Sequence, residues 1–245
     1  MTTVLKLGGS LITDKDRRET LDDAALSAAA DAVADADVGT DLALVHGAGS
    51  FGHHYAEKYG VSVTEGTTDA GAALEIHGSM TTLNRFVLSR LHDRNVPALP
   101  VHPLSAGARD GEASLDFSLT TVCTMLDEGF VPVSHGDVVA HEGKGTTIIS
   151  GDELVARFAT ALDADRVGLC STVDGVYDAE GDVIDRIERF DDVADALGGS
   201  DATDVTGGMA GKVRTLLDLD APAYVFGAAD LPTFLDGGEP GTRID

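Results

Sequence analysis

Two glycine-rich turns hold the residue types that bind phosphate groups. The first, LKLGGSLITDK at residues 5–15, places two glycines directly after a short apolar run, with Lys6 and Lys15 at either side. Glycine exposes backbone N–H groups to an anion, and each lysine adds a compact positive charge. The turn therefore indicates a site for a phosphate or polyphosphate.

Lysine is rare in this chain, and its placement supports the same interpretation. Of five lysines, three lie in or beside glycine-rich motifs: Lys6, Lys15 and Lys212. Lys212 is expected about one turn inside a helix that begins after glycines and continues to residue 217. The amino end of a helix attracts anions, so Lys212 could reach back toward the same ligand.

The second turn, LVHGAGSFGHH at residues 44–54, follows a second apolar run. His53 comes just after the glycines and could donate a hydrogen bond to a phosphate oxygen. We expect His46 and His54 to be structural. Two such turns predict two anion sites that face each other, as a phosphoryl donor and a phosphorylated acceptor require.

Asp152 lies in SGDELVA, directly before an expected helix at residues 153–162. Its position allows two interpretations. It could cap the helix, or its carboxylate could orient a nearby lysine. The spacing alone does not decide between them.

These motifs follow an alternation of strands and helices that predicts an α/β fold with a mainly parallel sheet. Apolar runs predict strands at residues 4–7, 41–46, 96–101, 130–134, 166–170, 223–226 and 242–244. Helices are expected at residues 21–37, 70–94, 119–126, 153–162 and 191–197. A hairpin is expected at residues 138–149, and either a hairpin or an irregular segment at residues 104–117. The 70–94 helix is expected to wall a small apolar pocket beside the second turn. We expect one domain, with an acceptor lobe at about 1–150 and a nucleotide lobe at about 151–245.

The composition narrows the classes of partner. Asp and Glu number 42 against 17 Lys and Arg, a formal charge of −25. This excess argues against nucleic acid or an anionic membrane as partner, and it is typical of adaptation to a high-salt cytoplasm. Two distant cysteines, Cys123 and Cys170, favour a reducing compartment. We expect no targeting segment and no membrane span, and therefore a cytoplasmic protein.

The motifs together resemble the amino acid kinase superfamily, since both turns, SGDELVA, STVDGVYD and DVTGGMAGKV occur in the family's order. The chain has no GxxxxGK[ST] motif. No GxGxxG motif follows the first expected strand, and the second ends in His46 rather than in an acidic residue, so a dinucleotide fingerprint is absent. The resemblance implies a three-layer αβα sandwich around a mainly parallel sheet. Lys15 together with His53 resembles, more narrowly, the isopentenyl phosphate kinases.

This resemblance implies transfer of the γ-phosphoryl group of ATP to isopentenyl phosphate, giving isopentenyl diphosphate for isoprenoid synthesis. Mg²⁺ would be carried by ATP, and no protein metal ligand is expected. The family's members are often dimers, so a homodimer is expected. Fosfomycin kinases resemble the same branch and provide the alternative, a kinase for another small phosphate or phosphonate. A third alternative is a nucleotide-binding sensor without turnover.

The resemblance also implies roles for individual residues. The catalytic set would be Lys6, Lys15, His53, Asp152 and Lys212, with Asp152 organising the lysines. The nucleotide would contact Lys6, Gly8, Gly9, Ser10, Gly49, Thr172, Asp174, Tyr177, Gly208 and Lys212. The acceptor phosphate would contact Ala48, Gly49, His53 and Gly151.

One residue departs from the family pattern. The second turn usually has a glycine where this chain has Ala48. If that position required a positive φ, alanine would be strained there. The geometry of the acceptor turn therefore depends on the backbone conformation of Ala48.

Overall fold

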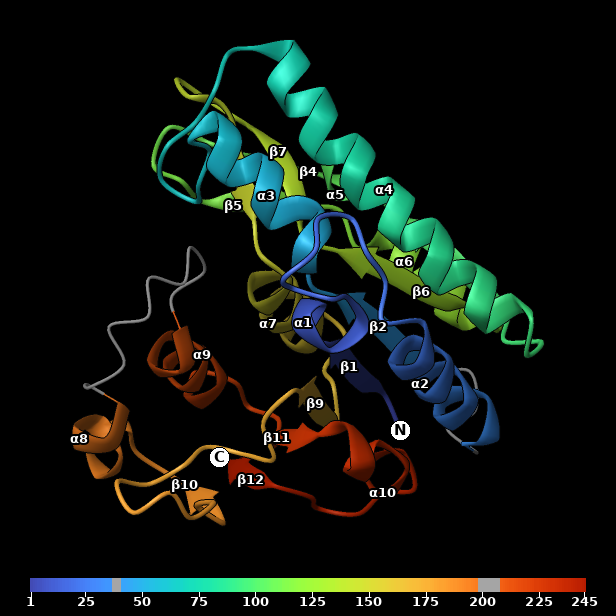
Figure 1. Ribbon diagram of the computed structural model, residues 1–245, viewed down its shortest axis with the longest axis vertical. Coiled ribbons are helices and arrows are strands. Elements are labelled where there is room, and N and C mark those ends of the chain that lie inside the picture. Colours follow the sequence, from blue (N-terminus) through green and yellow to red (C-terminus); the bar gives the residue numbers. More distant parts are fainter. Residues whose placement is uncertain (37–40, 198–207) are drawn as a thin grey trace.

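The computed structural model describes residues 1–36, 41–197 and 208–245. Within these residues, eight strands form one sheet in the order β10-β12-β11-β9-β1-β2-β6-β3 (Figure 1). Their bounds are β1 (Thr3–Leu7), β2 (Leu42–His46), β3 (Ala98–Val101), β6 (Val131–His135), β9 (Arg166–Ser171), β10 (Arg186–Ile187), β11 (Ala223–Gly227) and β12 (Thr242–Ile244). The pair β11–β12 is antiparallel and the other neighbours are parallel, which confirms the predicted sheet.

Helices cover both faces of this sheet. The described helices are α1 (Gly9–Ile12), α2 (Asp23–Asp35), α3 (Gly49–Tyr59), α4 (Ala70–His92), α5 (Pro103–Ala106), α6 (Thr120–Asp127), α7 (Gly151–Ala161), α8 (Ala194–Leu197), α9 (Gly208–Leu217) and α10 (Leu231–Leu235). Two 3₁₀ turns, η1 (Phe190–Asp192) and η2 (Ala228–Asp230), complete the set. The long helix expected at residues 70–94 is α4, and the one expected at 21–37 is the shorter α2.

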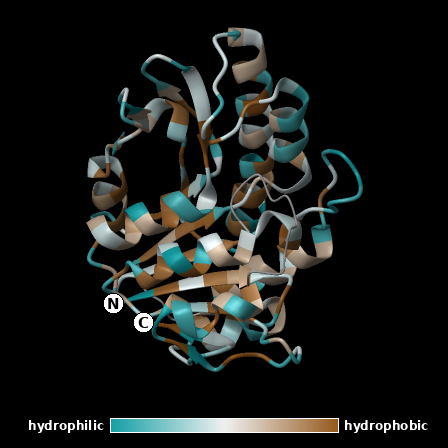
Figure 2. Ribbon diagram, turned by 90° about the vertical axis from the view of Figure 1, so that its left-hand side faces the viewer, coloured by the Kyte–Doolittle hydropathy of each residue, from teal (hydrophilic) through white to brown (hydrophobic). Residues whose placement is uncertain are grey.

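Alternation along the central strands explains the three layers. Successive side chains of a strand point to opposite faces of the sheet. On β1, Val4 packs into a core cluster with Leu154 of α7 and Val213 of α9. Leu5 packs into a second cluster with Leu26 of α2 and Leu83 of α4. Figure 2 shows the brown, apolar strands between helices whose ribbons mix teal and paler residues.

A smaller sheet adjoins the large one where β6 ends, since β7 follows β6 after a single residue. Its order is β5-β4-β7-β8, with β4 (Gly107–Arg109), β5 (Leu115–Phe117), β7 (Asp137–His141) and β8 (Gly145–Ile149). The antiparallel pair β7–β8 confirms the hairpin predicted at residues 138–149, and the pair β4–β5 shows that residues 104–117 contain a hairpin. In Figure 1 this sheet lies with α3 and α4 in the upper part of the molecule, while β9 to β12 lie below.

β1 joins the two parts, because it pairs with β2 on one side and with β9 on the other. The large sheet is therefore continuous, and a lobe boundary near residue 150 stays a proposal. Among the described helices, none is both long and apolar enough to cross a membrane.

Candidate active site

A cavity of about 230 Å³ lies where the central parallel strands end. Gly8 follows β1, Gly47 follows β2, Gly136 follows β6 and Thr172 follows β9, and all four residues line it. The strands end level with one another, because Leu7 is in register with both His46 and Cys170. The carboxyl edge of a parallel sheet is the usual place for a ligand in this architecture.

The two glycine-rich turns pack directly against each other in this cavity. A Cβ atom on Gly9 would lie 2.1 Å from the Gly49 nitrogen, and one on Gly47 would lie 2.5 Å from the Gly9 nitrogen. No side chain fits at either position. The two turns can therefore bring their backbone N–H groups to one small region, which suits adjoining phosphate groups.

Ala48 carries no strain in this arrangement. Its φ is −76° and its ψ is −32°, a right-handed conformation that any residue adopts. The positive φ of the turn, +51°, falls on Gly49 instead. The possibility that alanine distorts the acceptor turn is therefore wrong.

Asp152 bridges two of the predicted lysines. Its Oδ1 atom lies 2.5 Å from Lys6 Nζ, and its Oδ2 atom lies 3.7 Å from Lys212 Nζ. The side chains are 10%, 13% and 21% exposed for Lys6, Asp152 and Lys212, so solvent screens these pairs only partly. One carboxylate thus holds two ammonium groups at the cavity wall.

Asp152 is not the cap of the following helix. α7 begins at Gly151, and the Ser150 hydroxyl accepts the capping hydrogen bond from the Glu153 N–H at 3.1 Å. This leaves both oxygens of Asp152 available to the lysines. Of the two interpretations that the sequence left open, the structure favours the lysine-orienting one.

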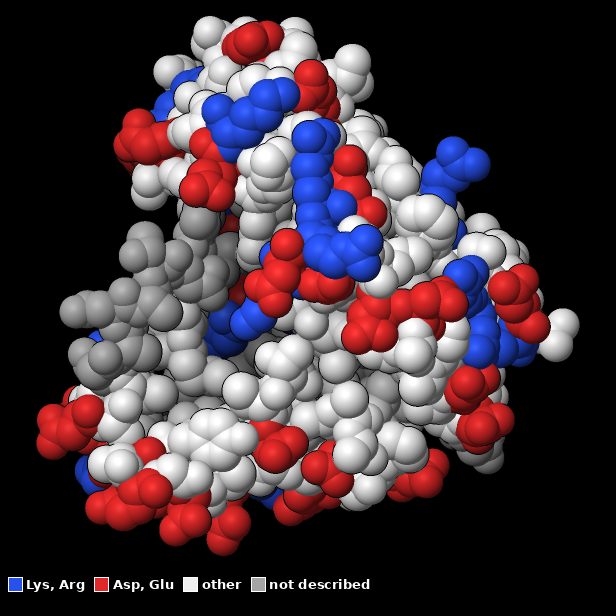
Figure 3. Space-filling model, viewed as in Figure 1, with Lys and Arg blue, Asp and Glu red and all other residues white. Residues whose placement is uncertain are grey.

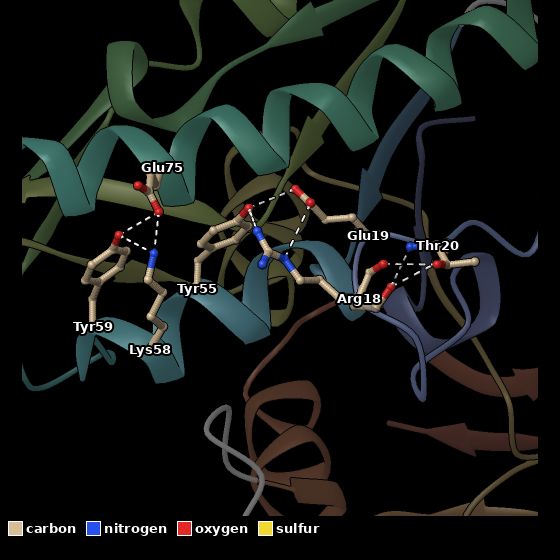
Figure 4. A network of polar contacts seen from close by, with 8 residues as sticks. Arg18, Glu19, Thr20, Tyr55, Lys58, Tyr59 and Glu75 are labelled. Atoms are coloured by element: carbon tan, nitrogen blue, oxygen red, sulfur yellow. Dashed lines mark hydrogen bonds and ion pairs between the residues drawn. The ribbon is translucent and has the colours of Figure 1, made fainter.

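Lys15 lies in an adjoining open hollow that shares Ser10 and Thr172 with the main cavity. It belongs to a loop at residues 14–20 that is closed by a bridge between Thr13 and Leu21. Figure 4 shows how this loop is held against α3. Arg18 donates a hydrogen bond to the Tyr55 hydroxyl, which donates to Glu19 Oε1 at 3.2 Å.

His53 lies on the first turns of α3 and lines the cavity. Its neighbour His54 does not line the cavity and instead packs its ring against Tyr55, with centroids 5.3 Å apart. The helix therefore separates the two adjacent histidines, one toward the cavity and one away from it.

An apolar wall adjoins the second glycine turn. Ile76 and Met80 of α4 form this wall of the cavity, together with Ile148 of β8. A Cβ atom on Gly52 would lie 2.6 Å from Met80 Sδ, so this glycine makes room for the methionine. The apolar pocket expected from the 70–94 helix is present.

The remaining predicted residues divide into two groups. Gly151, Ser10, Thr172 and Lys212 line the cavity. Asp174, Tyr177 and Gly208 do not line it; the Asp174 N–H donates to the Tyr177 hydroxyl at 3.3 Å. The first four residues of DVTGGMAGKV, 204–207, lie outside the described residues.

Sequence reasoning assigned no role to a polar network behind the apolar wall. Asp137 lines the cavity, and its Oδ2 atom accepts a hydrogen bond from His77 Nδ1 at 2.7 Å. This bond raises the pKa of His77, while burial raises the pKa of Asp137 and lowers that of His46 to about 4. The sequence does contain a pattern that indicates this network. His46 and His135 each end a strand, β2 and β6, and each is followed by a glycine.

Cys170 also lines the cavity, but its thiol does not act as a nucleophile. Burial raises the pKa of its thiol to about 12, so the thiolate is absent near neutral pH. The chemistry of the cavity therefore depends on its cations, its N–H groups and its imidazole.

Comparison with known proteins places this geometry in a family. The model of the amino acid kinase family matches residues 1–219. An isopentenyl phosphate kinase of Haloferax volcanii is 61% identical over 98% of this chain and 97% of its own length. The chain belongs to the amino acid kinase family, in its isopentenyl phosphate kinase branch.

Other members of the branch are similar to this chain over its whole length. The isopentenyl phosphate kinase of Methanocaldococcus jannaschii is 32% identical over the whole of this chain and 99% of its own. A crystal structure described as that of isopentenyl phosphate kinase superposes with a TM-score of 0.86 at 30% identity, covering all of both chains. The amino acid kinase fold expected from the motifs is thereby confirmed.

Proposed function

We propose that this kinase transfers the γ-phosphoryl group of ATP to isopentenyl phosphate, giving isopentenyl diphosphate and ADP. The observation that carries the choice of acceptor is the junction between the second glycine turn and α4. There the backbone of the glycine turn lines the same cavity as Ile76 and Met80. A molecule with a phosphate head and a short branched hydrocarbon tail matches both surfaces.

The reaction needs positioning and charge stabilisation more than acid–base chemistry. An oxygen of the acceptor phosphate attacks the γ-phosphorus, and the bond from the γ-phosphorus to the β,γ-bridging oxygen breaks. That oxygen leaves with the electron pair as part of ADP. Because the acceptor is already an anion, no general base has to remove a proton.

We assign the lysines to the charge that moves during this transfer. Lys6 and Lys15 would hold the transferring phosphoryl group, and Lys212 would stabilise the leaving β-phosphate. Asp152 would keep Lys6 and Lys212 in place through the two contacts described above. Groups fixed before the reaction stabilise a transition state without further reorganisation.

The other predicted residues would hold the two substrates. His53 and the backbone of Ala48, Gly49 and Gly151 would bind the acceptor phosphate. The nucleotide would contact Gly8, Gly9, Ser10, Gly49, Thr172, Asp174, Tyr177 and Gly208. Both oxygens of Asp152 face lysines, so we propose that Mg²⁺ is held by the phosphate oxygens of ATP.

A panel assay tests the acceptor. Purified protein is given ATP with isopentenyl phosphate, dimethylallyl phosphate or fosfomycin, and the product is identified by ³¹P NMR. We expect turnover of isopentenyl phosphate to its diphosphate. Turnover of fosfomycin alone would replace the proposal with the phosphonate kinase, and nucleotide binding without any turnover would indicate the sensor.

A matched pair of variants on α4 tests the apolar wall. Ile76→Asn places a polar amide in the wall and should raise the KM for isopentenyl phosphate about tenfold while leaving the KM for ATP near its wild-type value. Leu74→Asn is the control, since Leu74 lies on the same helix but is 67% exposed. An equal effect of both variants would contradict the assigned pocket.

We further propose a cytoplasmic homodimer. Size-exclusion chromatography with light scattering measures the assembly. A mass near the 25.3 kDa of one chain would overturn the dimer.

A further inference from the structure

Two buried histidines stand side by side at the edge of the site. His46 ends β2 and His135 ends β6, and the two residues are in register. Both are fully buried, and their rings stack with centroids 5.4 Å apart and an interplanar angle of 27°. The proposed mechanism uses neither side chain.

Each ring is tied to the backbone of the glycine that follows it. His46 Nδ1 lies 3.1 Å from the Gly47 carbonyl oxygen, and His135 Nδ1 lies 3.0 Å from the Gly136 carbonyl oxygen. A carbonyl oxygen only accepts, so Nδ1 carries the proton in both rings. Burial keeps the pKa of His46 near 4, and the ring is therefore neutral at pH 7.

Neutral His46 with its proton on Nδ1 can only accept a hydrogen bond at Nε2. That atom lies 3.2 Å from the side-chain oxygen of Asn84, whose Nδ2 has no partner within the described part of the chain. Turning the Asn84 amide over pairs both atoms, since Nδ2 then donates to Nε2. In that orientation Asn84 is compatible with the tautomer that binds Gly47.

The bond to Gly47 has a consequence on the other side of the peptide. In a trans peptide the C=O and N–H groups point in opposite directions, and no cis peptide occurs in the described residues. With the Gly47 oxygen held by His46, the Ala48 N–H points away from that ring. Ala48 lines the cavity, and a Cβ atom on Gly9 would lie 3.0 Å from the Ala48 nitrogen, so this nitrogen lies where the two glycine-rich turns meet.

We propose that His46 is a positioning residue that fixes the Gly47–Ala48 peptide so that the Ala48 N–H faces the acceptor phosphate. A peptide turned the other way would present the Gly47 carbonyl oxygen to that anion, replacing attraction with repulsion. The stack on His135 holds the His46 ring in place. The inference rests on the proposed function, because it takes a phosphate as the ligand of this turn.

Paired substitutions separate hydrogen bonding from packing. His46→Asn keeps a donor near the Nδ1 position, whereas His46→Leu fills similar space without one. We expect His46→Leu to raise the KM for isopentenyl phosphate about 10- to 100-fold, with His46→Asn within about threefold of wild type. The KM for ATP should change little in either variant. His141→Leu is the control for a buried histidine, since His141 bonds Thr147 in the smaller sheet away from the cavity.

Equal KM values for His46→Leu and wild type would overturn the inference, and so would equal defects in both His46 variants. The wild-type protein gives a second measurement that needs no variant to fold. Long-range ¹H–¹⁵N NMR reports the tautomer of His46, and a proton on Nε2 would also overturn the inference. If wild type phosphorylates only fosfomycin, the proposed function fails, while the tautomer and the KM for fosfomycin still test His46.

Discussion

Lys6 on β1 and Asp152 on α7 are separated by 146 residues and form an ion pair at 2.5 Å. The same carboxylate faces Lys212 from the far end of the chain. Asp152→Asn preserves the shape but removes the charge that holds the two ammonium groups in place. We expect kcat to fall about 100-fold or more, because preorganised charge stabilises the transition state.

Steady-state kinetics with both substrates measures this effect. Glu153→Gln is the matched control, since Glu153 is the next residue and pairs instead with Arg109 at 2.6 Å. Its kcat should stay within about threefold of wild type. Equal losses in both variants would show that the role of Asp152 is the stability of α7.

His53 and His54 are adjacent but differ in what they face. His53→Ala removes a proposed donor to the acceptor phosphate and should lower kcat/KM for isopentenyl phosphate about 10- to 100-fold. His54→Ala removes a ring that packs on Tyr55, and its kcat/KM should stay close to the wild-type value. Similar losses in the two variants would mean that the imidazole role is misassigned.

Lys15 acts, in the proposed mechanism, on charge that develops during transfer. Lys15→Ala should therefore lower kcat chiefly, by about 100-fold, with a smaller change in KM. Lys58→Ala is the control, because Lys58 is exposed and pairs with Glu75 on the surface of α4. A Lys15→Ala variant with only its KM changed would count against this assignment.

The buried His46 ring makes stability depend on pH. Its pKa falls from 6.5 to about 4 on folding, so the unfolded chain takes up a proton first as the pH drops. The contribution is present above pH 6.5 and is lost between about 6.5 and 4, on the order of 3 kcal/mol. The lowered pKa of His135 acts in the same direction, and the raised pKa of buried Asp137 acts in the opposite one.

Chemical denaturation of wild type and His46→Asn from about pH 7.5 to about pH 4.5 isolates this contribution, because the other groups are common to both proteins. The wild-type free energy of unfolding should fall more steeply over this range. Parallel curves would show that His46 does not titrate as its burial requires.

The acidic surface predicts stability that rises with salt. Figure 3 shows Asp and Glu gathered along the lower edge of the molecule, with Lys and Arg side chains beside the central hollow. At a net charge of −25, screening relieves repulsion among carboxylates. Raising KCl from about 0.1 M to about 3 M should increase Tm by about 10 °C or more. Full stability in dilute buffer would contradict the high-salt interpretation.

Local pattern was sufficient for the central strands and for α2, α4, α6 and α7. It did not predict α3, the helix that carries His53. The apolar residues before Gly8 and before Gly47 form β1 and β2. A short apolar segment that ends at a glycine is typical of a buried strand. The small differences lie at helix ends, as where Ser150 rather than Asp152 caps α7. A cap depends on the conformation of one residue, and spacing does not specify it.

The sequence alone determined the two glycine-rich turns and predicted the three lysines of the motifs and His53 as site residues, since each rests on residue type and short-range spacing. Only the tertiary structure decided that Asp152 joins Lys6 to Lys212, that Ala48 is unstrained and that His46 stacks on His135. Each of these depends on where separate strands and helices are brought together or on the φ of one residue. Pairing and packing settle such relations through the whole sheet, so no single stretch of sequence contains them.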